Sequence, residues 1–181
     1  MPETSTSNNR VYWNTTDFVS ASPNNYKNQL ELVTAPAGGA PHGSYGLSAV
    51  VGNRFAEMNA NSNAVLYQDI QTVPGSTIRI GFSHGGRTGS PTQQMQVNVG
   101  NPTNTVDTIN ANNVSVAARN TLALSGLSTL TVYNSSGTSF TTQTASLGSW
   151  NRYSGEYVVP NNQTLTRFAF QAVTPTTGVG N

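Results

Sequence analysis

Apolar and polar residues alternate along several short stretches of the chain, which is the pattern of half-buried β-strands. The clearest stretches are residues 77–82, 95–99, 129–133 and 165–173, with further candidates at 30–33, 140–144 and 150–159. Turn residues separate them: Pro74-Gly75 fits a type II turn, and residues 134–137 form a hairpin-like turn. No stretch forms a convincing amphipathic helix, and residues 114–117 fit either a strand or a short helical turn. About eight to ten strands at this spacing predict an all-β antiparallel sandwich of the jelly-roll type.

The domain organisation predicted from this pattern is simple. Residues 1–9 are polar and are expected to form a flexible leader, and residues 10–181 form one jelly-roll domain without an internal repeat or linker. Residues 35–48 are rich in glycine and proline and form a long loop, which contains His42 and Tyr45. Long loops in compact domains often carry function, so both side chains are candidates to reach a ligand. The alternative is a solvated connection between strands.

Composition narrows the classes of function. Only 8% of the residues are charged, against about 25% in an average soluble domain, and eight basic residues nearly balance seven acidic ones. This balance gives no electrostatic basis for binding nucleic acid. No apolar run approaches the roughly 20 residues that span a membrane, and the first residues have no signal-peptide pattern. A surface of hydroxyl and amide groups in place of charges is typical of secreted bacterial adhesins and fibre proteins, which favours an extracellular, cell-surface location.

The groups needed for catalysis or metal binding do not form a recognisable motif. There is no cysteine, and His42 and His84 are the two histidines. Neither lies near a nucleophile-elbow sequence, and the acidic residues follow no glycosidase or zinc-site pattern. The sequence therefore predicts a protein that is not an enzyme and needs no cofactor.

Four short motifs make the chain resemble a known family. They are residues 55–60 (FAEMNA), residues 66–69 (LYQD), the Pro74-Gly75 turn and residues 84–87 (HGGR). Bacterial extracellular jelly-roll domains, which are related to galactose-binding-like sandwiches and carbohydrate-binding modules, carry similar motifs. Met58 replaces the usual leucine, and Gly85 stands where arginine is common. The resemblance implies a galactose-binding-like jelly roll in which a structural calcium ion is possible, although the carboxylates expected in the family's last strand are absent here.

A carbohydrate site needs aromatic rings for the apolar face of a sugar and planar polar groups for its hydroxyls. The predicted ligand-binding residues belong to the first, second and fourth motifs, the last of which contains a Gly-Gly loop: Glu57, Asn59, Tyr67, His84 and Arg87. If Met58 faces the core, the strand pleat would turn Glu57 and Asn59 outward together. The two glycines before Arg87 would bend the backbone sharply and aim its side chain at the same patch.

Each of these assignments has a structural alternative. Glu57 could form a surface ion pair with Arg54 or another arginine, and His84 could be a rim histidine hydrogen-bonded to backbone. Trp13 and Trp150 could supply rings to a sugar, but tryptophan more often belongs to the core of a sandwich.

Two functions follow from these observations. The first is a non-catalytic carbohydrate-binding or adhesive module of a bacterial surface protein, with a glycan or cell-surface ligand as partner. The second is a self-assembling structural subunit of an extracellular filament or fibre. Members of the resembling family continue into a further strand after a Gly-x-Gly-Asn stretch, which leaves three explanations open. The sequence stops short of that strand, its end diverges from the family in a self-contained fold, or residues 165–173 lack a neighbour and accept a strand from another molecule.

Overall fold

The computed structural model describes residues 13–17, 30–43, 45–58, 62–89, 93–111 and 114–173. Strands make up 46% of these residues and helices 9%, and all the paired strands are antiparallel. The predicted all-β antiparallel sandwich is therefore confirmed. The predicted leader, residues 1–9, lies outside the described residues.

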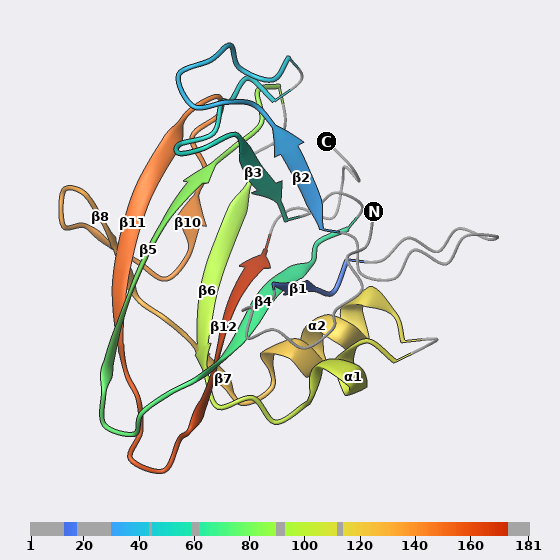
Figure 1. The fold of residues 1–181 in the computed structure, drawn as a ribbon, viewed down its shortest axis with the longest axis vertical. Coiled ribbons are helices and arrows are strands. Elements are labelled where there is room, and N and C mark those ends of the chain that lie inside the picture. The colour runs from blue at the N-terminus through green and yellow to red at the C-terminus, as the bar shows by residue number, and fades with distance from the viewer. Residues whose placement is uncertain are drawn as a thin grey trace.

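Two sheets form the sandwich, and a third, smaller sheet lies at one end of it (Figure 1). The first sheet has the order β1 (Asn14–Thr15), β4 (Val65–Gln71), β12 (Leu165–Ala172), β6 (Gln94–Gly100) and β10 (Gln143–Thr144), and β7 (Leu127–Thr129) also pairs with β6. The second sheet has the order β5 (Thr77–Gly85), β11 (Trp150–Val158), β8 (Val132–Asn134) and β9 (Ser139–Phe140). The third sheet pairs β2 (Glu31–Thr34) with β3 (Arg54–Glu57).

The chain crosses repeatedly between the first two sheets. From β4 to β12, the strands lie in the first sheet (β4), the second (β5), the first (β6, β7), the second (β8, β9), the first (β10), the second (β11) and the first (β12). This double Greek-key connectivity is that of a jelly roll. The turn predicted at Pro74-Gly75 joins β4 to β5: Ser76 N donates to Val73 O at 3.1 Å, and Gly75 has a φ of 76°. These are the features of a type II turn.

Two helices cover the outer face of the first sheet, which corrects the expectation that the chain has no convincing helix (Figure 1). They are α1 (Val106–Ile109) and α2 (Val116–Leu124), and each begins after a residue whose hydroxyl accepts a backbone hydrogen bond, Thr105 for α1 and Ser115 for α2. Residues 116 and 117, which fitted either a strand or a helical turn, belong to α2. The apolar pattern of α2 is weak because it buries an arginine, Arg119, together with Ala123.

The first sheet is buried on both faces, and each face has its own core. Val65, Tyr67 and Ala169 point to the helices and pack with Ile109 and Ala123. On the other face, Met95 and Val97 pack against side chains of the second sheet, Val132 and Tyr153 among them, to form the core of the sandwich. Strands β4 and β12 therefore contribute residues to both sides.

Three strand predictions need correction. Residues 129–133 do not form one strand: β7 ends at Thr129 in the first sheet, and β8 begins at Val132 in the second. Residues 140–144 divide in the same way between β9 and β10. The stretch 165–173 does not lack a neighbour, because β12 pairs with β4 on one side and with β6 on the other. The strand-donation argument had assumed an open edge at this position.

A buried ion pair fastens the helices to the first sheet. The fully buried guanidinium of Arg167 donates to both carboxylate oxygens of Asp69, at 2.6 and 2.7 Å. It also donates to the backbone oxygens of Asn104 and Ala123, and it lies over the ring of Tyr67 at 4.6 Å. The arginine of β12 thus holds β4, the segment before α1 and the end of α2 in one arrangement.

Asp69→Ala tests this role. The substitution leaves the Arg167 charge buried without its carboxylate, so we expect the free energy of unfolding to fall by about 3–5 kcal/mol. Glu156→Ala is the control, because it breaks an ion pair with Arg79 whose side chains are 58% and 82% exposed. Loss of that pair should change stability by less than about 1 kcal/mol. Urea unfolding of both variants measures the difference, and equal losses would contradict the assignment.

Candidate functional site

A cavity of about 450 Å³ lies at the end of the sandwich that carries β2 and β3. Its interior is apolar, and its walls come from both large sheets and from the β2–β3 pair. Aromatic and aliphatic side chains line it: Trp13, Leu30, Leu32, Leu47, Phe55, Met58, Leu66, Phe82, Met95, Trp150 and Phe170. Polar side chains line it as well: Ser83, His84, Tyr45, Glu57, Arg87, Gln93 and Gln94.

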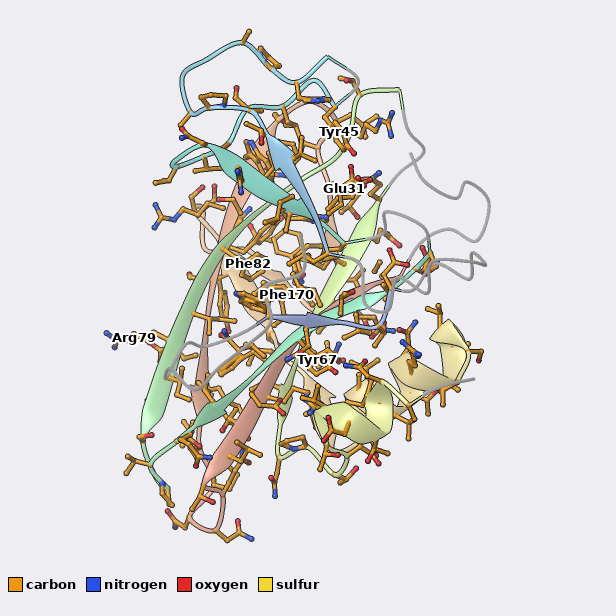
Figure 2. The ribbon with its side chains drawn as sticks, turned by 45° about the vertical axis from the view of Figure 1, so that its right-hand side comes forward. Glu31, Tyr45, Tyr67, Arg79, Phe82 and Phe170 are labelled. Atoms are coloured by element: carbon orange, nitrogen blue, oxygen red, sulfur yellow. The ribbon has the colours of Figure 1, made fainter. Side chains whose placement is uncertain are left out.

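Tyr45 organises the polar part of the wall. Its hydroxyl donates a hydrogen bond to Glu57 and lies 3.5 Å from Glu31 Oε1. The guanidinium of Arg87 lies over the Tyr45 ring, 4.8 Å from its centre. The two glutamates are cross-strand partners in β2 and β3, and Figure 2 shows Glu31 and Tyr45 near each other at this end of the molecule. A loop residue therefore joins two carboxylates and a guanidinium into one cluster.

The electrostatics of this cluster follow from partial burial. Burial raises the pKa of Glu57, although the hydrogen bond from Tyr45 opposes the shift. Burial, and then the hydrogen bond to Glu57, raise the pKa of Tyr45 well above its usual value, so that Tyr45 remains a hydrogen-bond donor. The cluster thus offers a carboxylate acceptor and a guanidinium donor beside an apolar interior.

A row of rings continues from the cluster into the cavity. Tyr45 contacts Phe55 edge to face at 5.7 Å, and Phe55 contacts Trp150 in the same way at 5.4 Å. The indole N–H of Trp150 donates to the backbone oxygen of Ser48 at 2.7 Å, which ties the ring to the end of the long loop. The loop 35–48 is therefore part of the site, as its length suggested.

His84 lies in the wall of the cavity. Its Nδ1 is buried and has no hydrogen-bond partner among the described residues, so this one nitrogen of the ring does not form the backbone hydrogen bond that was the alternative from the sequence. Burial lowers the pKa of His84 to about 4. The side chain is consequently neutral at physiological pH.

Gly85 serves a different purpose from the sharp bend that the sequence suggested. Residue 85 is the last residue of β5 and pairs with Trp150 across the sheet. A Cβ atom at this position would lie 2.8 Å from both Ser149 O and Trp150 Cε3. The absence of a side chain therefore lets the indole ring approach the β5 backbone, and the arginine common in the resembling family would not fit there.

The structure brings together three of the five predicted residues. Glu57, His84 and Arg87 line the same cavity. Glu57 does not face outward, because it and Met58 both line the cavity, and its partner is Tyr45 in place of Arg54. Asn59 lies outside the described residues.

Tyr67 does not flank this site. Its ring is fully buried between the first sheet and the helices, beneath Arg167, and Figure 2 shows it well away from Tyr45. Successive side chains of a strand point to opposite faces, so Tyr67 lies on the face of β4 opposite to Leu66, and it is Leu66 that lines the cavity.

Sequence reasoning did not place Phe55, Gln93 or Glu31 in the site, and it favoured a core position for Trp150. The pleat that placed Glu57 could also have placed Phe55, because residues two positions apart on a strand such as β3 share a face. Glu31 could not be found from a motif, because only the pairing of β2 with β3 brings it beside Glu57.

Metal-binding groups do not gather in the part of the chain that the structure describes. No three histidine or acidic side chains there lie close enough to hold an ion. No helix within the described ranges is long and apolar enough to cross a membrane.

Comparison with known proteins gives one structural likeness. Neither the protein-family models nor the curated proteins match the sequence. Among solved structures, the chain is similar to the N-terminal CBM22-1-CBM22-2 tandem domain of Xyn10C from Paenibacillus barcinonensis, with a TM-score of 0.44 and 16% sequence identity. The likeness covers 83% of this chain and 38% of the tandem, so the chain spans well under half of that structure's length. It concerns the β-sandwich alone.

The burial of His84 predicts a pH-dependent stability. The unfolded chain takes up a proton near the ordinary pKa of 6.5, whereas folded His84 does so only near pH 4. Between these values the unfolded state binds more protons, so the free energy of unfolding should fall by about 3 kcal/mol as the pH drops from 6.5 to 4. Below pH 4 the loss is complete, and above pH 6.5 the full stability is present.

His84→Gln isolates this effect from the carboxylates. The variant cannot take up the proton, so the difference in unfolding free energy between wild type and variant should grow in favour of the wild type from pH 4 to pH 6.5 and then stay constant. Urea unfolding over this pH series measures it. A difference that does not change with pH would mean that His84 titrates as an exposed histidine does.

Proposed function

We propose that this chain is a non-catalytic carbohydrate-binding module, acting as a binding or adhesive unit of an extracellular bacterial surface protein. One observation supports this most directly: the row Tyr45–Phe55–Trp150 and the planar polar groups of Glu57, Arg87 and Gln93 line the same cavity. Rings cover the apolar C–H face of a sugar, while carboxylate, guanidinium and amide groups bond its hydroxyls in fixed directions. The low charge of the chain favours the extracellular location.

The carboxylates of the site favour binding over hydrolysis. Glycoside hydrolysis needs two carboxyl groups on either side of the scissile bond, about 5 to 10 Å apart. Glu31 and Glu57 instead approach the same hydroxyl, that of Tyr45. Tyr45 occupies the position between them, so no glycosidic oxygen can take it.

Self-assembly into a filament has less support. The reason to expect strand donation was a last strand without a neighbour, and β12 lies between β4 and β6. Nothing else in the described ranges favours a filament over a binding module.

A glycan array, run with and without calcium on material first checked for oligomers, tests the proposal and selects a ligand. Arg87→Ala and Glu57→Gln should then each weaken binding of the selected glycan by roughly 1.5–3 kcal/mol, the range for a hydrogen bond to a charged group. Isothermal titration calorimetry measures the loss.

Glu156→Gln serves as the control. It removes an exposed carboxylate on the outer face of the second sheet and should leave affinity unchanged. The proposal fails if no glycan binds, or if the control loses as much affinity as the two site variants.

A further inference from the structure

A second cavity, of about 340 Å³, lies beside the first and differs from it in charge, because the first is lined by both a carboxylate, Glu57, and a guanidinium, Arg87. Four residues belong to the walls of both cavities: Phe55, Phe82, Ser83 and Trp150. A ligand large enough to extend past these shared residues would therefore contact both cavities. Val50 and Val51 complete the apolar part of the second cavity and are themselves largely exposed.

Two arginines line this second cavity, and no acidic residue does. Arg54 comes from β3 and Arg152 from β11, so distant parts of the chain deliver them to one place. Neither guanidinium makes a hydrogen bond or ion pair with any described residue. In a chain with eight basic residues, two of them lie unpaired around a single cavity.

Another arginine on the same pair of strands has an acidic partner. Strands β5 and β11 place Arg79 opposite Glu156, and these two side chains form an ion pair at 2.7 Å. Ser83 lies four residues after Arg79 on β5 and on the same face of the sheet. Its cross-strand partner on β11 is Arg152, so this arginine faces a neutral side chain. Figure 2 shows Arg79 projecting from the side of the molecule, away from Tyr45 and Glu31. The arginine outside the cavity is thus neutralised within the chain, and the one at the cavity is not.

We propose that the bound saccharide carries an acidic group, a carboxylate or a sulfate, which Arg54 and Arg152 hold in the second cavity. Guanidinium groups bind planar or tetrahedral oxyanions through paired N–H donors, and here they have no competing partner in the chain. The first cavity sets its one guanidinium, Arg87, beside the carboxylate of Glu57, whereas the second is lined by two guanidiniums and by no described carboxylate. This difference favours the second cavity for an acidic group and leaves uncharged hydroxyls for the first. This inference rests on the proposed function, because it assigns the chemical class of the same ligand.

Matched sugars test the inference. The protein is titrated by NMR with glucose, sodium glucuronate and glucose 6-sulfate, at low and at high salt. We expect the two acidic sugars to bind at least about tenfold more tightly than glucose, the gain from one hydrogen bond to a charged group, and to lose part of this advantage at high salt. Comparison of glucuronate with glucose 6-sulfate tells which oxyanion the site prefers.

The variants assign the effect to the second cavity. Arg54→Gln and Arg152→Gln should each reduce binding of the acidic sugars by about tenfold or more while leaving glucose unaffected. Both side chains are exposed, so the fold should tolerate the changes. Arg79→Gln removes the same charge from the same sheet face outside the cavity, and it should leave all three affinities unchanged.

The outcomes separate this inference from the proposed function. If all three sugars bind equally well, or if Arg79→Gln weakens binding as much as Arg152→Gln does, the acidic subsite is overturned. If the Glu57→Gln variant nevertheless binds the sugars more weakly than the wild type does, the proposed carbohydrate-binding function still holds. Acidic sugars whose binding depends on Arg54 but not on Glu57 would support the acidic site and overturn the first cavity as a sugar site.

Discussion

The buried ion pair between Arg167 and Asp69 is the interaction on which the arrangement of this molecule depends. A guanidinium without solvent contact is tolerated only when its donors are satisfied, and Arg167 satisfies them with a carboxylate on β4 and backbone oxygens of Asn104 and Ala123. These partners belong to three different segments. They must all be in place together, which fixes the helices over one face of the first sheet.

Once the helices cover that face, the other face is left for the sandwich core and the cavity. Met95, Phe82 and Phe170 lie in the cavity wall as well as against the core, so the cavity is a continuation of the space between the two sheets. At this end the wall of the cavity is formed by the β2–β3 pair and the long loop, in addition to the two large sheets. The loop supplies Tyr45, and a loop can vary in sequence without disturbing the sheets, whereas the rings beneath it are held by the core.

The two cavities divide the charges of the site. The first presents the Glu57 carboxylate and the Arg87 guanidinium, both in contact with Tyr45, and the second presents two arginines without a counter-ion among the described residues. Partial burial strengthens the effect of Glu57, because charges at a surface concavity are less screened than those in open solvent, whereas the side chains of Arg54 and Arg152 are exposed. A region with both charges and a purely basic region, separated by shared aromatic walls, would give an acidic ligand one preferred direction.

The sequence by itself determined the features that depend on neighbouring residues. Period-2 alternation predicted β5, β6, β11 and β12, and Pro74-Gly75 predicted its turn, because pleating and turn geometry involve only a few consecutive residues. Clustering along the sequence led to Glu57, His84 and Arg87 as predicted site residues, and these three residues line the first cavity, although the outward turn of Glu57 and the sharp bend before Arg87 that were expected are not what brings them there.

Only the tertiary structure decided which face of each strand meets which partner. Neighbouring residues of a strand such as Leu66 and Tyr67 face opposite sides of β4, but the sequence does not tell that helices bury Tyr67 and that the cavity receives Leu66. Helix α2 has a weak apolar pattern because its buried arginine is satisfied by Val114 O and Ala111 O, contacts that exist only in the folded chain. The pairs Glu31–Glu57 and Ser83–Arg152 depend on strand register, which is set by the turns and by packing across the whole sheet, and no short stretch of sequence contains that information.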